Sequence, residues 1–326
     1  MNKIRIGVIG LGKMGTYHMN LCEEVNELEL TAVSDIDKNK FDCFSESLQI
    51  KAFTDYRKVL AFVDAVIIAT PTELHYGIAK YCLNNNKHVL VEKPITTDLH
   101  MAEELYDIAI RKKLVLNIGH VERFNGAVLE LRKIINNPYL VESRRVGPYE
   151  KKNSNNSIVL DLLIHDIDII MNIVKRNVVL IEATGSSVCS DIADIAVVHI
   201  VFENSTIANM LVSRITQKKE RTLSITQDDA YILLNYTNQD INIYRKGQSM
   251  HIFREKELKY MNEYTQERLF IYKENPLKQE IRHFVDCINK GEGRNVTIDH
   301  ELKSLKLALD IDNIIKNNNN RVKVFI

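Results

Sequence analysis

The sequence predicts an α/β protein whose N-terminal part is a doubly wound parallel sheet and whose C-terminal part is built on a second sheet. Three observations lead to this prediction. Short apolar runs alternate with helical stretches from residue 4 to residue 119, which is typical of consecutive βα units. A glycine-rich turn at residues 10–15 directly follows the first apolar run. Longer strand-like segments joined by turns then occupy about residues 180–245.

Composition limits the classes of function that the chain can have. Of 326 residues, 45% are hydrophobic and 26% are charged, which is ordinary for a globular protein with about two domains. The 43 basic and 43 acidic residues cancel, so no global field attracts nucleic acid or an anionic membrane. Five scattered cysteines without a Cys-x-x-Cys pair indicate free thiols in a reducing compartment. With no room for a signal peptide and no apolar run near the ~20 residues of a membrane span, we expect a cytoplasmic protein.

The first βα unit carries a nucleotide-binding motif. The run Ile4–Ile9 predicts a strand, and a helix follows to about Glu24. Between them the three glycines of a Gly-x-Gly-x-x-Gly motif allow a tight turn, the approach of a pyrophosphate to the backbone, and close helix–strand packing. The helix N-terminus supplies N–H groups for the phosphates. The expected cofactor contacts are Gly10, Gly12, Lys13, Met14 and Gly15.

The second strand, Leu28–Ser34, ends at an acid that selects the cofactor. Asp35 lies twenty residues after Gly15, where a carboxylate accepts hydrogen bonds from the ribose of NAD and repels the extra phosphate of NADP. Asp37 is the less favoured ribose partner, and no basic residue follows directly. The sequence therefore predicts NAD.

Three further strands continue the parallel sheet: Asp64–Thr70, Val89–Val91 and Leu114–Gly119. Helices follow the first two, to about Asn85 and, after a Thr97-Asp98 cap, to about Arg111. Because the carboxyl ends of parallel strands form the ligand edge of such sheets, residues just after them are expected at the cofactor. A solvated strand end is the alternative for the lysine that ends Val89–Val91. The residues concerned are Thr70, Pro71, Glu92 and Lys93.

Beyond His120 the pattern changes to one further helix, a polar and basic segment at Tyr139–Ser157, and a series of strands. In Thr206–Thr216 both alternating faces are largely apolar, so we expect one face to cover helices and the other to lie in a subunit interface. Helices are predicted from Pro276 to Gly291 and from Asp299 to about Asn317. The strands are predicted at Leu180–Val188, Ile195–Phe202, Thr206–Thr216, Arg221–Thr226 and Tyr231–Tyr236.

A second set of polar residues interrupts the apolar stretch from Leu160 to Val174. Asp161, His165 and Asp168 follow at i, i+4 and i+7, on one helical stripe. A solvated helix face is the alternative, but unpaired polar groups in a mostly buried segment would be costly. A histidine oriented by a carboxylate suits proton removal from an alcohol near neutral pH, and a lysine can stabilise the developing alkoxide. Zinc is a competing interpretation, which the lack of a cysteine or second histidine disfavours.

Together, Gly10-x-Gly12-x-x-Gly15, Glu92-Lys93-Pro94 and Asp161-x-x-x-His165-x-x-Asp168 resemble the glucose–fructose oxidoreductase/inositol dehydrogenase/MocA (Gfo/Idh/MocA) family, over nearly the whole chain. The resemblance implies an NAD-binding Rossmann domain at residues 1–120. It implies a substrate-binding and oligomerisation domain at residues 121–326, with a large, open, mostly antiparallel sheet that forms dimers or tetramers. It also implies a catalytic site of Lys93, Asp161 and His165, with a cis Lys93–Pro94 bond. Leu163 stands where the family usually has glycine.

Within the family, Glu122-Arg-Phe-Asn125, Gly147-Pro148 and the segment around His165 resemble the branch containing UDP-N-acetylglucosamine 3-dehydrogenases, although Gly126 replaces the proline common there. A sugar nucleotide needs cationic partners for its diphosphate, and basic residues lie between the two catalytic segments; a solvated loop is the alternative for these. They are Arg123, Arg144, Arg145, Lys151 and Lys152. The expected substrate contacts are Lys93, Arg123, Asn125, Tyr149, Asp161 and His165.

The leading hypothesis is NAD-dependent oxidation of a sugar nucleotide, at the 3-hydroxyl of UDP-N-acetylglucosamine. His165 would be the base, Asp161 its orienting partner and Lys93 the link between hydroxyl and cofactor, with Lys93 as the alternative base. Three other hypotheses remain open: a free-sugar or inositol dehydrogenase, an NAD-dependent glycoside hydrolase, and a non-catalytic NAD-sensing regulator.

Overall fold

The structure, a computed structural model, describes residues 3–43, 50–150, 156–254, 257–291 and 293–319. The chain forms two compact units. The first unit comprises Met1–Phe124 with Glu274–Lys306, and the second comprises Asn125–Lys273 with Leu307–Ile326. The functional boundary expected at residues 120 and 121 stays a prediction.

The first unit contains a six-stranded sheet in which all neighbouring strands are parallel. The strand order β3-β2-β1-β4-β5-β6 is that of a Rossmann fold, which confirms the predicted doubly wound sheet. The three-residue edge strand β3 lacks an apolar run long enough to predict it. The strands are β1 (Ile4–Ile9), β2 (Leu28–Ser34), β3 (Lys51–Phe53), β4 (Ala65–Ile68), β5 (His88–Glu92) and β6 (Leu116–Gly119).

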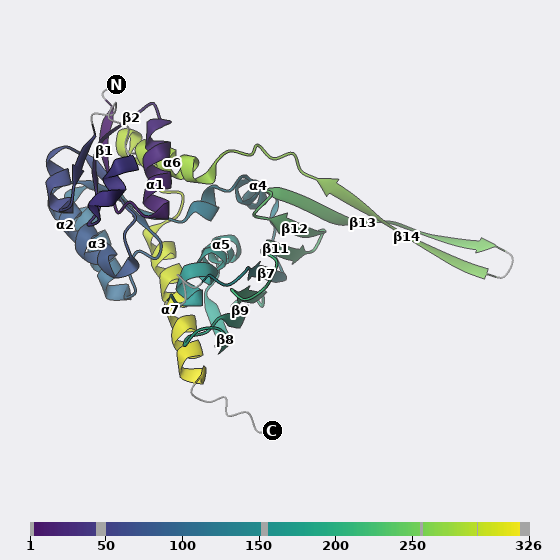
Figure 1. Cartoon of the computed structure of the whole chain (residues 1–326). Helices are drawn as coiled ribbons and strands as arrows, with labels where there is room; N and C mark the ends of the chain where they lie inside the picture. Colours follow the sequence, from purple (N-terminus) through teal and green to yellow (C-terminus); the bar gives the residue numbers. More distant parts are fainter. Residues whose placement is uncertain (1–2, 44–49, 151–155, 255–256, 292, 320–326) are drawn as a thin grey trace. The chain divides into compact units, whose positions relative to one another are not determined.

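Helices cover both faces of this sheet (Figure 1). The side chain of Asp98 accepts a hydrogen bond from the N–H of Met101 and so caps α3, as the sequence predicts. The last helix of this unit comes from far along the chain and packs against α1 in one apolar core. The helices are α1 (Lys13–Glu23), α2 (Thr72–Asn84), α3 (Leu99–Lys112) and α6 (Pro276–Lys290), with short 3-10 turns at Lys38–Cys43, Tyr56–Ala61 and Val121–Phe124.

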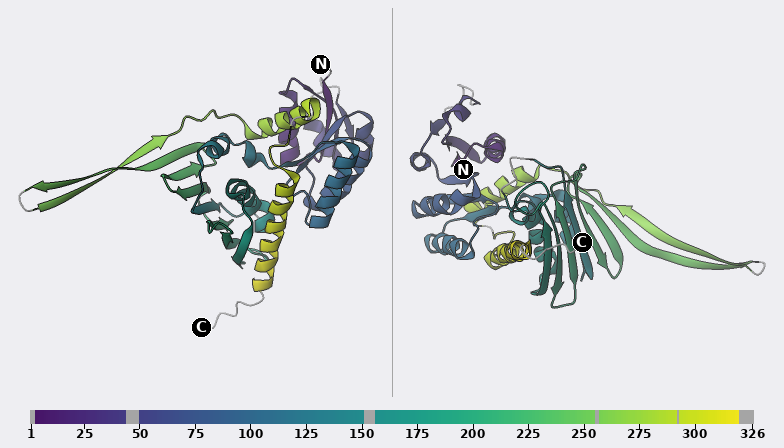
Figure 2. Two further views of the ribbon diagram at one scale, coloured as in Figure 1. Left: turned by 180° about the vertical axis from the view of Figure 1, so that it is seen from behind. Right: turned by 60° about the horizontal axis from the view of Figure 1, so that its bottom comes forward.

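The second unit is built on an eight-stranded sheet of order β14-β13-β12-β11-β7-β10-β9-β8. Among the strand pairs that the structure describes in this sheet, only β7 and β10 are parallel, so the sheet is mostly antiparallel, as expected. Beyond Tyr244, β13 pairs with β14 alone and the two form a long arm (Figures 1 and 2) that the sequence pattern did not predict. The strands are β7 (Leu140–Val146), β8 (Val178–Ser186), β9 (Ile195–Phe202), β10 (Ile207–Ser213), β11 (Glu220–Gln227), β12 (Ala230–Asn235), β13 (Asp240–Arg254) and β14 (Glu257–Arg268).

One face of the second sheet is covered by helices. Ala208, Met210 and Val212 are at most 1% exposed and share a core with residues of α4 (Gly126–Ile134), α5 (Ile164–Val174) and the second half of α7 (Ile298–Asn319). The opposite face is open and mixed in character: Ile207, Asn209 and Leu211 are partly exposed, Val197 is 54% exposed, and His199 lies opposite Asn209. The prediction that one face of this sheet covers helices is therefore confirmed.

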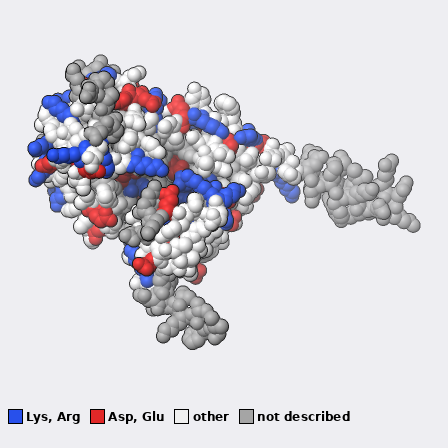
Figure 3. Space-filling view, viewed as in Figure 1, with Lys and Arg blue, Asp and Glu red and all other residues white. Residues whose placement is uncertain are grey.

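Charges are mixed on the surface. In the face shown in Figure 3, Lys and Arg are interspersed with Asp and Glu, as expected from the net charge of zero. Among the described residues, no helix is long and apolar enough to cross a lipid bilayer.

Candidate active site

Four strands of the first unit bring the predicted cofactor residues to one edge. In the parallel register, Ile9 lies beside Ser34 on one side and Ile68 on the other, and Ile68 lies beside Val91. The segments that follow these strands therefore leave the sheet together, at the point where the order reverses between β1 and β4. That crevice is where doubly wound sheets bind nucleotides.

The glycine turn is shaped to receive a phosphate group. Gly10 has a φ of +93°, in the region that favours glycine. A Cβ on Gly15 would lie 1.7 Å from the carbonyl oxygen of Gly10, whereas a Cβ on Gly12 would meet no atom within 4 Å. Open space at Gly12 and the N-terminus of α1 provide the room and the N–H groups that a pyrophosphate needs. Lys13 is exposed, and Met14 packs partly against the apolar core.

Asp35 is held as a carboxylate at the end of β2. It accepts hydrogen bonds from the N–H groups of Leu11 (2.7 Å) and Asp37 (3.0 Å) and from Lys40 (2.9 Å). Burial alone would raise the pKa of Asp35, but these hydrogen bonds outweigh burial and lower the pKa. The carboxylate thus ties the glycine turn to the end of β2, where a ribose would be bound.

The two segments after β4 and β5 are joined by a histidine. The ring of buried His75 lies 2.8 Å from the carbonyl oxygen of Thr70 through one nitrogen and 2.8 Å from that of Pro94 through the other. The Lys93–Pro94 bond is cis, as the resemblance implied, and Lys93 is partly exposed. The buried hydroxyl of Thr70 has no hydrogen-bond partner among the described residues, which suits a site that a ligand completes. Pro71 is exposed.

Glu92 forms a hydrogen bond with buried His18 (2.7 Å). Burial raises the pKa of Glu92, but the hydrogen bond with His18 and the charge interactions with His18, Lys93 and His75 together lower the pKa by more. Behind it, Glu280 of α6 is 2% exposed, and its pKa is raised well above the ordinary value, first by burial and then by repulsion from Glu92. The same kind of burial therefore ends in opposite net pKa shifts for Glu92 and Glu280, because only Glu92 has a hydrogen-bonded partner that favours its charge.

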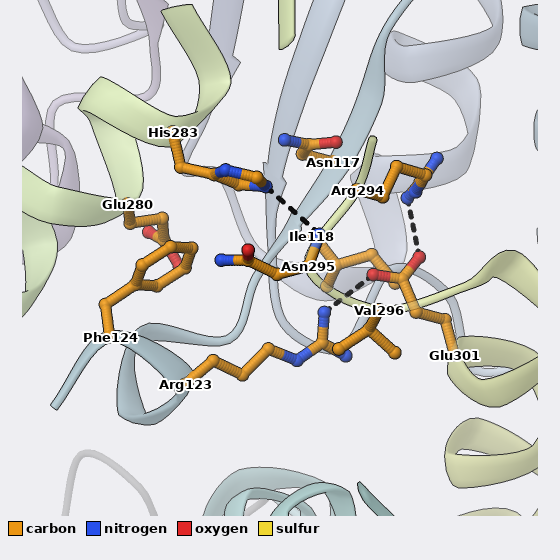
Figure 4. A pocket seen from close by; sticks show the side chains of 10 residues that line it. All are labelled: Asn117, Ile118, Arg123, Phe124, Glu280, His283, Arg294, Asn295, Val296 and Glu301. Atoms are coloured by element: carbon orange, nitrogen blue, oxygen red, sulfur yellow. Dashed lines mark hydrogen bonds and ion pairs between the residues drawn. The ribbon is translucent and has the colours of Figure 1, made fainter. Parts of the chain in front are cut away.

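Arg123 is held inside the first unit. It lines a small cavity of about 20 Å³ and donates to Glu301 (2.7 Å), which also accepts from Arg294 (2.6 Å) and from Tyr106. Figure 4 shows both guanidinium groups reaching the one carboxylate. With side-chain exposures of 5% and 3% for Arg123 and Glu301, this pair is a buried ion pair, so Arg123 has a structural role beside any contact with substrate.

In the second unit, Asp161 lies in a π-helical turn, Val159–Leu163, that leads directly into α5. The sequence interpretation assumed a regular α-helix, and this wider turn changes the angle between Asp161 and the residues of α5. Asp161 and His165 are partly exposed, but Asp168 is buried, and its backbone carbonyl oxygen accepts a hydrogen bond from the side chain of Asn172. The expected stripe of three polar residues is therefore accessible only at its first two members.

Two departures from the family pattern have local explanations. Leu163, where glycine is usual, is fully buried in the core of the second unit. Gly126, where proline is common, donates its N–H to Gln239 (3.0 Å), and a Cβ there would lie 2.9 Å from the carbonyl oxygen of Tyr272. Proline has no N–H and carries a Cβ, so it does not suit this position.

The remaining expected substrate contacts are engaged locally. Asn125 caps α4 and donates to the carbonyl oxygen of Tyr236 (2.9 Å), and Tyr149 donates to the carbonyl oxygen of Cys189 (3.2 Å). Arg145 forms a buried, two-point ion pair with Asp166 (2.6 and 3.2 Å). Arg144 pairs with Glu220 (3.3 Å). Lys151 and Lys152 lie outside the described residues.

The second unit also contains a basic pocket that was not predicted from the sequence. The pocket has a volume of about 180 Å³, and Asp161 shares its lining with Arg214, Lys219 and Arg221. A signal was present, because Lys218-Lys-Glu-Arg221 precedes a predicted strand. Such charge runs are common on solvated turns, so the run alone did not indicate a site.

Asp194 fixes one arginine of this pocket. The carboxylate accepts from Arg214 (2.8 Å) and from the N–H groups of Val188 (2.8 Å) and Cys189 (2.6 Å). Burial raises the pKa of Asp194, but these hydrogen bonds outweigh it and place the pKa far below the ordinary value.

Replacing Asp194 with asparagine is therefore expected to lower the free energy of unfolding at pH 7 by about 3 to 5 kcal/mol, since it leaves a buried arginine unpaired. A depressed pKa stabilises the fold above the unfolded value of about 3.9 and stops doing so as pH falls toward the folded value. The difference between wild type and Asp194→Asn should thus be constant down to about pH 4 and shrink below it. Urea unfolding at several pH values measures this; a difference that persists undiminished in strong acid contradicts it.

The comparisons with known proteins agree with this geometry. Residues 4–120 match the family model described as "Oxidoreductase family, NAD-binding Rossmann fold", and residues 122–233 match the GFO/IDH/MocA C-terminal domain. The chain is 32% identical over 248 residues to UDP-N-acetylglucosamine 3-dehydrogenase of Acidithiobacillus ferrooxidans, covering 76% of this chain and 79% of the relative. It is 29% identical over 195 residues to myo-inositol 2-dehydrogenase of Thermotoga maritima, covering 56% and 58%.

Solved structures give the same grouping. A structure of the Acidithiobacillus ferrooxidans UDP-N-acetylglucosamine 3-dehydrogenase matches with a TM-score of 0.87 and 28% identity, over 97% of this chain and 99% of that chain. Scyllo-inositol dehydrogenase of Lactobacillus casei, solved with bound NAD(H) and scyllo-inositol, matches with a TM-score of 0.79 and 20% identity, over 97% and 98%. The second likeness shows a shared fold.

Proposed function

The chain belongs to the GFO/IDH/MocA family of NAD-binding oxidoreductases, and on that premise we propose that it oxidises a ring hydroxyl of a sugar nucleotide. The proposed substrate is UDP-N-acetylglucosamine, oxidised at the 3-hydroxyl to the 3-keto sugar. The observation that carries the proposal is the match to a dehydrogenase of that name along most of both chains. A 3-keto sugar nucleotide is a substrate for transamination, so the product would supply an amino sugar for a surface polysaccharide or lipid A.

Each part of the site has a proposed role. NAD, when bound, would supply the acceptor for the hydride. The residues at 10–15 hold its pyrophosphate, and Asp35 holds the ribose, with Thr70, Pro71 and Glu92 lining the same edge. Lys93 donates a hydrogen bond to the reacting oxygen and stabilises negative charge there. His165 accepts the hydroxyl proton, and Asp161 orients it. Lys93 is the alternative proton acceptor. Arg123, Asn125 and Tyr149 remain proposed substrate contacts.

The test is a substrate panel with the purified protein and NAD. UDP-N-acetylglucosamine, other UDP-sugars, free glucose and the inositols are supplied in turn, with a hydroxylamine to trap the ketone and NADH absorbance as the readout. The proposal expects the highest kcat/KM with UDP-N-acetylglucosamine and a ketone at carbon 3. Turnover confined to inositols or free glucose would contradict the proposal and indicate a free-sugar or inositol dehydrogenase. Product without net NADH would indicate glycoside hydrolysis, and NAD binding without turnover of any sugar would indicate a regulator.

The open face of the second sheet supports a further part of the proposal. We propose that it forms a homodimer or homotetramer interface, because apolar residues such as Val197 stay more than half exposed on it. Sedimentation at micromolar concentration is expected to show a dimer or tetramer; a monomer at all concentrations would remove this part. We also place the enzyme in the cytoplasm, where NAD and sugar nucleotides are available.

A further inference from the structure

The basic pocket of the second unit lies beside Asp161. It is bounded by the π-helical turn, the end of β7, the end of β10 and the start of β11. Four of its lining residues are basic, although the chain as a whole carries no net charge. This concentration of cations next to a proposed catalytic carboxylate has no role in the oxidation step itself.

The two inner arginines have their own carboxylates. Arg145 pairs with Asp166 and Arg214 pairs with Asp194, and all four side chains are at most 6% exposed. Buried ion pairs of this kind keep a fixed geometry, because breaking either would leave an uncompensated charge. Arg145 and Arg214 therefore form a rigid part of the pocket wall. Their positive charges are neutralised by the two aspartates, so they contribute to the shape of the pocket.

The two outer cations sit where an incoming ligand would meet them. Arg221 lies directly opposite Arg145 in the antiparallel register of β7 and β11, so the two side chains are on the same face of the sheet. Lys219 directly precedes β11 and lines the same pocket as Arg221, and its side chain passes Gly147, with Cγ 4.0 Å from where a Cβ would be. Lys219 is exposed and Arg221 is partly exposed. Two basic side chains that line one pocket and reach solvent are suited to bind an anion.

We propose that this pocket is a phosphate subsite, in which Lys219 and Arg221 bind the diphosphate of a substrate whose ring lies at Asp161. The inference rests on the proposed function and assigns the part of the site that recognises a nucleoside diphosphate. The guanidinium fork of Arg221 matches two phosphate oxygens, and the ammonium of Lys219 supplies a compact charge. Inositol and free glucose carry no anion, so this subsite favours sugar nucleotides over them. The exposed carboxylate of Glu150 also lines the pocket and opposes the anion.

Kinetics of charge-removing variants test the subsite. Lys219→Met and Arg221→Met are each expected to raise KM for UDP-N-acetylglucosamine about tenfold, the size of one charge-assisted hydrogen bond, and to leave kcat and the KM for NAD within about twofold. Glu150→Gln should lower KM. Lys218→Met is the matched control, because Lys218 is an exposed neighbour of the same charge that does not line the pocket. Variants as sensitive as this control, or Glu150→Gln raising KM, would overturn the assignment.

A binding measurement makes the inference independent of turnover. Calorimetric titration uses UDP and inorganic pyrophosphate as probes, with NADH saturating so that the glycine turn is already occupied. Wild type and Lys218→Met are expected to bind both probes, and the Lys219→Met/Arg221→Met double variant to bind neither. Wild type that binds neither probe overturns the subsite. If the wild-type protein binds UDP but oxidises no UDP-sugar, the subsite is supported and the proposed reaction is wrong. Failure of the subsite can therefore be distinguished from failure of the proposed function.

Discussion

Replacing Lys93 with alanine is expected to lower kcat by about 10²- to 10⁴-fold, the range for a group that moves or stabilises a proton in the transition state. The affinity for NAD should change little, because the phosphate and ribose contacts come from the glycine turn and Asp35, neither of which depends on this side chain. Stopped-flow NADH formation measures turnover, and quenching of NADH fluorescence measures binding. Lys58→Ala, which removes an exposed lysine of the same unit, is the control.

The same experiment separates the two candidates for the proton acceptor. If Lys93 only stabilises charge, the variant should retain the pH dependence set by His165, with a limb between about pH 5 and about pH 8. If Lys93 is the base, Lys93→Ala should lose most of its kcat, and His165→Asn should retain most of its own. A Lys93→Ala enzyme with wild-type kcat would remove Lys93 from the catalytic site altogether and return it to the solvated strand end that the sequence alone allowed.

The first unit was predictable because its signals are local. Gly10, Gly12 and Gly15 lie between a strand and a helix, and the backbone conformation and close approaches that require glycine occur there. Buried parallel strands appear as short apolar runs such as Val89–Val91, so their order along the chain could be read directly. The position of α6 could not be predicted in this way, because the apolar face of the helix at Pro276–Lys290 does not indicate which of the two units it packs against.

In the second unit, candidate polar residues could be picked out from the sequence, but the contacts of their side chains could not be predicted. Arg145 was predicted as a cation for substrate, yet its charge is used by Asp166 inside the unit. A side chain on a strand points to one of the two faces of the sheet. The residues next to Arg145 in the sequence do not indicate which of these faces is buried. The π-helical turn at Asp161 is also invisible to a period of 3.6 residues. Lys219 and Arg221 could not be identified as site residues from the sequence, because they line a pocket with Asp161 only once β7, β10 and β11 are packed together.

A pair of glycine variants should separate the shape of the cofactor cradle from the stability of the fold. Gly12→Val adds atoms to a space with no neighbour within 4 Å, at a φ of −72° that any residue adopts. The unfolding midpoint without NAD is expected to stay near that of wild type. Gly15→Ala places a Cβ 1.7 Å from the carbonyl oxygen of Gly10, so the backbone must move, and we expect a loss of about 3 kcal/mol or more.

Both variants should lose NAD, but for different reasons, and thermal unfolding with and without cofactor distinguishes them. At a concentration of 100 Kd, NAD stabilises a protein that binds it by about 2.7 kcal/mol, which wild type should show as a raised midpoint. Gly12→Val should show a normal midpoint that NAD no longer raises, because the added methyl groups occupy the position of the pyrophosphate. Gly15→Ala should begin from a lowered midpoint. If NAD still raises the midpoint of Gly12→Val by the wild-type amount, the pyrophosphate does not approach the backbone at Gly12, and the cradle must be placed elsewhere along the edge of the sheet.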